Sequence, residues 1–99
     1  MVVWREGSSV PKYIIERRLT EGPMSQEMLR AAAQRSAKAI MELGPGIQWV
    51  ESFVTDDTIY CVYIAANEAI IREHAFRGEL PADRVGEVRE IIDPTYAED

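Results

Sequence analysis

The side chains best suited to chemistry in this sequence are one histidine, one cysteine and two carboxylates that interrupt apolar segments. His74 is the only histidine and Cys61 the only cysteine in the chain. Neutral imidazole and thiolate both bind divalent transition metals, and imidazole also carries protons near neutral pH. Each residue also has a simpler interpretation, because a lone histidine or cysteine on an apolar stripe is most often a packed core residue.

Glu16 and Glu51 each place a carboxylate inside an otherwise apolar segment that is predicted to be a strand. A charge in the middle of a strand is costly unless it is paired or bound to something. Arg17 is adjacent to Glu16, but neighbouring strand residues point to opposite faces, so a partner must come from elsewhere. The two carboxylates are therefore either rim residues in salt bridges, or hard oxygen ligands or general bases.

Several function classes lack their usual motifs in this sequence. There is no Gly-x-Ser-x-Gly elbow, no Gly-rich phosphate loop and no His-Glu-x-x-His helix. No second histidine or cysteine stands at metal-ligand spacing, so a self-contained site of the zinc-finger kind is not expected. The net charge of -6, from 11 basic and 17 acidic residues, repels a phosphate backbone, and nucleic acid is not expected as a partner.

Four strands and two helices are predicted to position these residues. Ser25 is a good N-cap for the first helix, which Gly44-Pro45-Gly46 ends, and Asn67 can cap the second helix, which Gly78 ends. β-branched and aromatic runs predict the strands. In chain order, the expected elements are a strand at 12–19, a helix from 25 to 43, strands at 47–55 and 58–65, a helix at 67–77 and a strand at 84–92.

A β-hairpin is predicted around Asp56-Asp57, because two turn-forming residues separate two apolar runs. Regular alternation then puts Trp49 and Glu51 on one face and Cys61 on the other. Both faces are substantially apolar, so the hairpin needs a covering layer on each side. The register that follows from a two-residue turn pairs Phe53 with Tyr60, Ser52 with Cys61, and Glu51 with Val62.

The order of these elements predicts an α+β fold, the ferredoxin-like β-α-β-β-α-β sandwich, with one four-stranded antiparallel sheet and two helices on one face. A chain of 99 residues has room for one hydrophobic core. We expect a flexible N-terminal arm at 1–11, the domain at 12–93 and a C-terminal tail at 94–99. The open face of the sheet is apolar, which favours an interface and predicts a homodimer.

The location of the protein is predicted from what the sequence lacks. No segment approaches the roughly 20 apolar residues of a membrane span, and the first ten residues hold no apolar block typical of a secretory signal. A single cysteine cannot form an internal disulfide, which favours a reducing compartment. We therefore expect a cytoplasmic protein without a membrane partner.

Two runs, 49–57 and 59–63, resemble the signature of small bacterial nickel-binding ferredoxin-like proteins. Residues 72–75 with Gly78 and Pro81, the segment 85–88 and residues 13–17 fit the same pattern, so the resemblance covers about 12–93. It implies a dimeric domain and, in at least some members, nickel binding. His74 and Cys61 match the family pattern, whereas Glu51 stands where relatives often have histidine. That departure replaces a nitrogen ligand by an oxygen ligand, which also suits magnesium and manganese.

The leading hypothesis is a metal-binding protein that sequesters or senses nickel or another divalent transition metal. The expected ligands, in order of preference, are His74, Glu51, Glu16 and Cys61. Because Glu51 and Cys61 lie on opposite faces of the predicted hairpin, they cannot both serve one ion. The alternative is a dimeric ferredoxin-like enzyme of the cofactor-free oxygenase or isomerase type, with His74 as base and Glu51 as its orienting partner. An interaction module without a small ligand is a third possibility.

Overall fold

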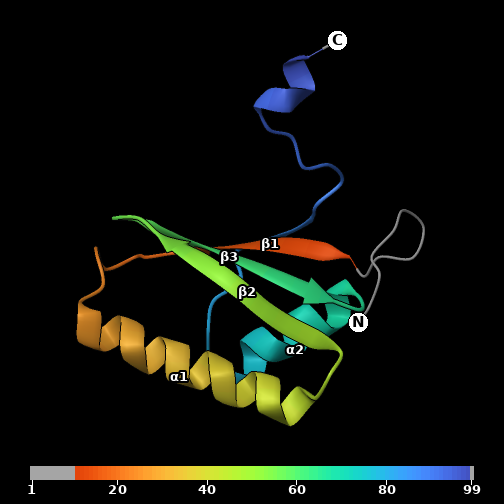
Figure 1. Cartoon of the computed structure of the whole chain (residues 1–99). Coiled ribbons are helices and arrows are strands. Elements are labelled where there is room, and N and C mark those ends of the chain that lie inside the picture. The colour runs from red at the N-terminus through yellow and green to blue at the C-terminus, as the bar shows by residue number, and fades with distance from the viewer. Residues whose placement is uncertain (1–10, 99) are drawn as a thin grey trace.

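The computed structural model describes residues 11–98, so the predicted arm at 1–11 lies, except for Pro11, outside the described residues. The elements follow the predicted order (Figure 1). They are β1 (Lys12–Arg18), α1 (Gln26–Leu43), β2 (Ile47–Val54), β3 (Thr58–Ala65), α2 (Glu68–Arg77), β4 (Arg84–Glu87) and a short 3-10 helix, η1 (Pro94–Ala97).

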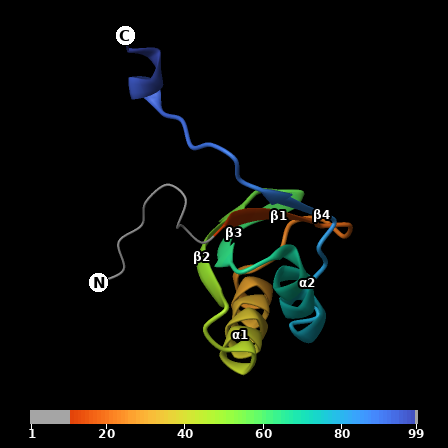
Figure 2. The ribbon, with the colours of Figure 1, turned by 90° about the vertical axis from the view of Figure 1, so that its right-hand side faces the viewer.

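The four strands form one antiparallel sheet in the order β2-β3-β1-β4. Both helices lie against the same face of this sheet, and neither covers the other face (Figure 2). The predicted α+β ferredoxin-like arrangement is therefore confirmed. We call the uncovered side of the sheet the open face.

The hydrophobic core lies between the sheet and the two helices. Alternate residues of β1 and β3 point into it, as the two-residue period of a strand requires. Tyr63, Ile15 and Ile71 are among its largest fully buried side chains, and Ile71 comes from α2. The helix-facing residues are therefore packed, whereas Ile14, Phe53 and Tyr60, on the opposite face, remain exposed.

The helices begin and end where the sequence predicts. Ser25 Oγ accepts a hydrogen bond from the Met28 backbone N–H at 3.1 Å, and Asn67 Oδ1 does the same for Ile70 at 3.0 Å. Gly44 follows α1 with φ of 83°, a conformation that glycine adopts easily. Neither α1 nor α2 has both the length and the apolar character of a membrane-crossing helix.

The β2–β3 hairpin has the predicted register, with Phe53 opposite Tyr60 and Glu51 opposite Val62. The predicted alternation is wrong at one point. Trp49 pairs with Tyr63, so Val50 is an extra residue in β2, a β-bulge. The bulge turns Trp49 to the helix-covered side of the sheet, where its Nε1 donates to Ser52 Oγ at 3.0 Å. Trp49 and Glu51 therefore lie on opposite faces.

The last strand is shorter than predicted, ending at Glu87 instead of residue 92. β4 pairs antiparallel with β1, and the Val88 N–H donates to the carbonyl of Lys12, the first residue of β1. Because β1 begins at Lys12, residues after Val88 have no residue of β1 with which to pair. Residues 89–98 run away from the sheet (Figure 1), with Ile91, Ile92 and Tyr96 exposed.

Candidate functional site

The four candidate ligands divide into two pairs on opposite sides of the sheet. His74 and Cys61 are buried between the sheet and the helices. Glu16 and Glu51 lie on the open face, where Glu16 is opposite Tyr60 and Glu51 is opposite Val62. The structure therefore does not bring the four residues together.

His74 lies in α2 on the side that faces the sheet, and its side chain is 0% exposed. Its Nε2 is 3.0 Å from Ser36 Oγ and 3.3 Å from the Ser36 carbonyl oxygen, and its ring packs on Tyr63 with centroids 4.9 Å apart. Nδ1 is buried and has no hydrogen-bond partner among the described residues. The sequence prediction that His74 points inward is thus confirmed.

Burial, and secondarily the positive charge of Arg17, lowers the pKa of His74 below its usual value of 6.5. The imidazole is therefore neutral at physiological pH. A neutral imidazole is the form that binds a metal or accepts a proton. Because the exposed fraction of His74 is zero, a metal ion or a proton donor cannot reach it from solvent without movement of the core.

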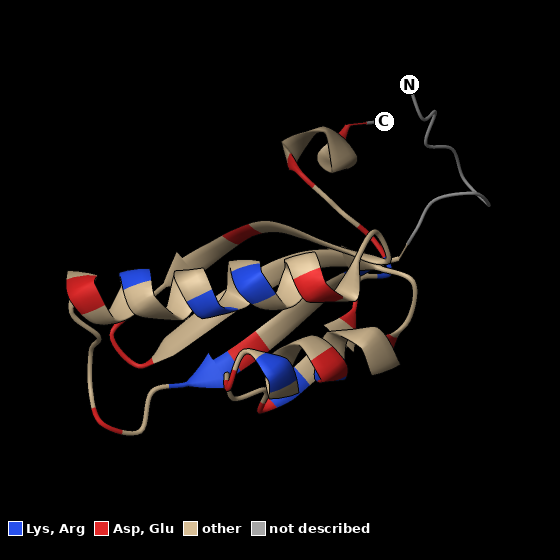
Figure 3. Ribbon diagram, turned by 90° about the horizontal axis from the view of Figure 1, so that it is seen from below, with Lys and Arg blue, Asp and Glu red and all other residues tan. Residues whose placement is uncertain are grey.

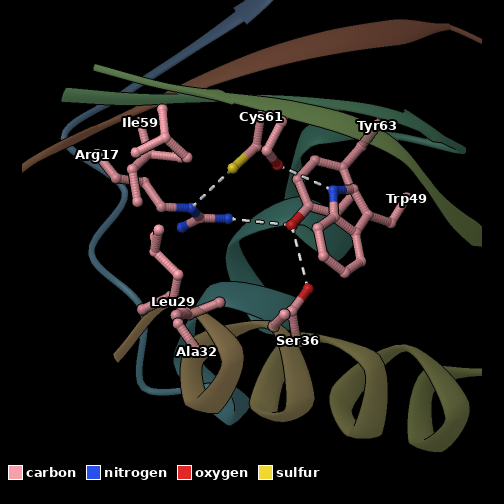
Figure 4. Close-up of a pocket in the computed structure, with 12 residues that line it drawn as sticks. Arg17, Leu29, Ala32, Ser36, Trp49, Ile59, Cys61 and Tyr63 are labelled. Carbon is pink, nitrogen blue, oxygen red and sulfur yellow. Dashed lines mark hydrogen bonds between the residues drawn. The ribbon is translucent and has the colours of Figure 1, made fainter. Parts of the chain in front are cut away.

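Arg17 is the chemically active side chain of the interior that the sequence analysis did not select. It is 3% exposed and lies beside Cys61, with its Nε donating to the Cys61 Sγ at 3.4 Å. Its Nη2 donates to the Tyr63 hydroxyl at 3.3 Å (Figure 4), and Nη1 donates to the Pro81 carbonyl oxygen. The strand period that directs Glu16 to the open face also directs Arg17 into the core.

A cavity of about 200 Å³ lies beside the Arg17 guanidinium, between α1 and the sheet. Most of its wall is apolar, and its polar lining includes Ser36, Ser52 and Tyr63. His74 does not line it, but is one hydrogen bond away through Ser36. Figure 4 shows the Arg17 side chain between Cys61 and Tyr63, with Leu29 and Ala32 of α1 on the opposite wall.

Glu16 and Glu51 occupy accessible positions on the open face. The Glu16 carboxylate is 4.0 Å from Arg84 Nε, at the outer limit of an ion pair, and its side chain is 34% exposed. Glu51 is exposed. Because β3 lies between β1 and β2, the backbones that carry the two carboxylates are about 10 Å apart across the sheet. No third histidine, cysteine, aspartate or glutamate side chain of the described residues completes a metal site with them.

The interior does not fit a nickel ion. In the described part of the chain, no three histidine, cysteine, aspartate or glutamate side chains converge on a common point. The Arg17 guanidinium, already bonded to Cys61, would repel a divalent cation bound at that thiol. The pairing of His74 with Glu51, which the enzyme hypothesis requires, also does not occur, because the two residues lie on opposite sides of the sheet.

The outer surface of the helices carries charges of both signs (Figure 3). Several of them are in exposed ion pairs, of which Arg72–Glu68 at 3.0 Å and Arg77–Glu73 at 2.9 Å are the shortest. Exposed pairs of this kind contribute between about 0 and 1 kcal/mol each. The helix surface is thus a layer of mixed charge that is partly paired, and the chemically distinctive groups lie in the core and on the open face.

Comparisons with known proteins agree with this fold. No curated protein sequence gives a match. The crystal structure of SCO4226 from Streptomyces coelicolor A3(2) resembles this chain with a TM-score of 0.68 at 21% identity, covering 82% of this chain and 99% of that one. A likeness at this identity shows a shared fold. A family described as "Nickel responsive protein SCO4226-like" matches residues 13–88. The chain therefore belongs to the SCO4226-like family of nickel responsive proteins.

Proposed function

We propose that this protein is a homodimer that binds nickel on the open face of its sheet, and so sequesters or senses the ion. The family to which residues 13–88 belong is named for a response to nickel. The observation that carries the choice of face is the accessibility of the candidate ligands. Glu51 is exposed, whereas His74 is fully buried and its pKa is lowered by burial and by the charge of Arg17.

An apolar surface on the open face supports the dimer. Phe53 is 55% exposed, and Ile14 and Tyr60 are exposed on neighbouring strands. Both helices lie on the other side of the sheet, so the chain's own helices leave this surface uncovered. Exposed apolar side chains on three neighbouring strands are typical of a protein interface. A second copy, with the same surface, is a self-complementary partner for it.

A dimer also supplies additional ligands for the metal ion, which a single chain lacks. Within one chain Glu16 and Glu51 are on strands separated by β3, and no third ligand joins them among the described residues, whereas a two-fold axis brings residues of one copy close to those of another. Carboxylate oxygens bind manganese and magnesium as well as nickel, so selectivity is a property to be measured. The proposal predicts that metal binding and dimer formation depend on one another.

Titration calorimetry of the full chain without an affinity tag tests the proposal. We expect Glu51→Gln, which keeps the shape and removes the charge, to weaken nickel binding by about tenfold or more, since even outer-shell changes cost about that much. A folded His74→Gln variant serves as the matched control and is expected to bind nickel as the parent does. Manganese and magnesium titrations measure the selectivity.

The opposite result would contradict the proposal. If His74→Gln abolishes nickel binding while Glu51→Gln leaves it intact, the ligand is the interior imidazole, and the core must open to admit the ion. If the parent chain binds no nickel in these titrations, nickel binding by this member of the family is ruled out.

A further inference from the structure

Arg17 presents an unusual combination of charge and surroundings. Its guanidinium is always protonated in proteins, and the residue is 3% exposed. None of the ion pairs among the described residues includes it. Its partners are the Cys61 sulfur, the Tyr63 hydroxyl and the Pro81 carbonyl oxygen, and none of them is a carboxylate. A buried cation without a counter-ion is costly, and this cost falls when an anion binds beside it.

The guanidinium keeps donors available for such an anion. It has five N–H groups, and three hydrogen bonds to Cys61, Pro81 and Tyr63 use one on each nitrogen. One N–H therefore remains on each of the two terminal nitrogens. Two terminal N–H groups are what a carboxylate accepts when it pairs with arginine. Burial raises the pKa of Tyr63 above 10.0, so its hydroxyl also stays protonated at neutral pH.

The cavity beside Arg17 restricts the rest of the ligand. Leu29, Ala32, Ala33 and Val54 give it an apolar wall, and its volume is about 200 Å³. An apolar cavity of roughly 150 Å³ accepts a benzene molecule, whereas sites for drug-sized ligands begin near 300 Å³. The space therefore suits one ring or one branched chain together with a single carboxylate. A phosphate group, with its greater charge and more acceptors, would find too few donors here.

We propose that the cavity between α1 and the sheet is a binding site for a small apolar monocarboxylate, with the carboxylate on Arg17 and the apolar body against α1. This site is separate from the proposed nickel site, because the sheet lies between them. Its test therefore contains no metal, and its outcome is independent of the nickel titrations.

The experiment uses benzoate and isovalerate as probes, with benzamide as the neutral analogue of benzoate. Each is titrated into the full chain by calorimetry. Trp49 lines the cavity and gives a second signal through its fluorescence, once Trp4, the other tryptophan, is replaced by phenylalanine. We expect saturable binding of at least one carboxylate, and binding of benzoate about tenfold to a hundredfold tighter than that of benzamide, as charge-assisted hydrogen bonds imply.

Two variants test separately the role of the Arg17 charge and the role of the cavity volume. Arg17→Met removes the guanidinium and keeps a long apolar stem, a replacement that buried ion sites often tolerate. It should remove the preference for benzoate over benzamide. Ala32→Leu fills the cavity and leaves Arg17 in place, so it should abolish binding of both probes even if Arg17→Met does not fold. Ala31→Leu, on the exposed side of α1, is the control and should bind as the parent does.

Three results would overturn the proposal. The first is absence of saturable binding for both carboxylates in the parent chain. The second is equal affinity for benzoate and benzamide, which would leave Arg17 as a purely structural residue. The third is an Ala32→Leu variant that binds benzoate as tightly as the parent and as Ala31→Leu, which would place the probe elsewhere on the molecule.

Discussion

His74 and Arg17 affect one another in the core although they make no direct hydrogen bond. Ser36 and Tyr63 lie between them: Arg17 donates to the Tyr63 hydroxyl, which is 3.4 Å from Ser36 Oγ, and Ser36 Oγ is 3.0 Å from the imidazole. The positive charge of Arg17 adds to burial in lowering the pKa of His74. Protonation of His74 would thus place a second cation in the core, and the folded state resists it.

This resistance predicts how stability depends on pH. The unfolded chain protonates His74 near pH 6.5, whereas the folded chain does so only at a lower pH, because its pKa is lowered. Between these two values the unfolded state binds more protons than the native state. The free energy of unfolding should therefore fall as pH drops below about 6.5, by at most about 1.4 kcal/mol per pH unit. Urea denaturation at several pH values between about 5 and 8 measures it.

His74→Gln is the control for this prediction, because glutamine does not titrate and keeps a polar group near Ser36. The variant should be less stable at pH 7.5 but should lose the part of the pH dependence that begins below about pH 6.5 in the parent chain. An unchanged slope in the variant would show that other groups cause the dependence.

At the scale of single residues, the sequence predicted His74 better than it predicted Arg17. The helical stripe of α2 placed His74 inward, and it is buried there. The strand pattern also indicated that Arg17 points into the core, since Tyr13, Ile15 and Arg17 alternate with residues of the open face. An arginine in a buried position of a strand is unexpected from its residue type, because arginine is seldom buried without a charged partner. The cavity that accompanies it depends on packing, which a sequence pattern does not determine.

At the scale of elements, the sequence predicted the structure correctly where turn residues or helix caps marked it. The Asp56-Asp57 turn gave the right hairpin register, and the caps at Ser25 and Asn67 start their helices. The bulge at Val50 carries no glycine or other residue that would mark it in the sequence. β4 ends early because its partner β1 begins at Lys12. The end of β4 therefore depends on the length of β1 and cannot be predicted from the residues of β4 alone.

The cap at Ser25 gives a prediction for α1. Ser25→Ala removes the hydroxyl that accepts from the Met28 N–H, and it should lower the free energy of unfolding by about 0.5–2 kcal/mol. Ser25→Asp restores an acceptor and should restore the stability, with a further gain from the helix dipole. Chemical denaturation of the three proteins measures the effect. Equal stability of the alanine and aspartate variants would mean that the cap makes no contribution.

At the scale of the whole molecule, the proposed dimer depends on the open face of the sheet. Phe53→Glu places a charge among the exposed apolar side chains of the open face, and burying it against a second copy would be costly. We expect the variant to be a folded monomer and the parent chain to be a dimer at micromolar concentration. Light scattering coupled to size-exclusion chromatography measures both masses.

Phe76→Glu is the matched control for the dimer. Phe76 is 80% exposed on α2, on the other side of the molecule, so the same change there should leave the dimer intact. A parent chain with the mass of a monomer would contradict the dimer directly. A Phe53→Glu variant that remains dimeric would place the interface on another surface.

The bulge at Val50 also determines how this chain should be aligned with its relatives. Before it, odd-numbered residues of β2, Ile47 and Trp49, face the helices, and after it the even-numbered Ser52 and Val54 do so. A relative without the extra residue requires a one-residue gap at position 50. A gap placed further along would match Glu51 with a residue from the opposite face of the sheet. Any ligand assigned by that alignment would then be transferred to the wrong side of the protein.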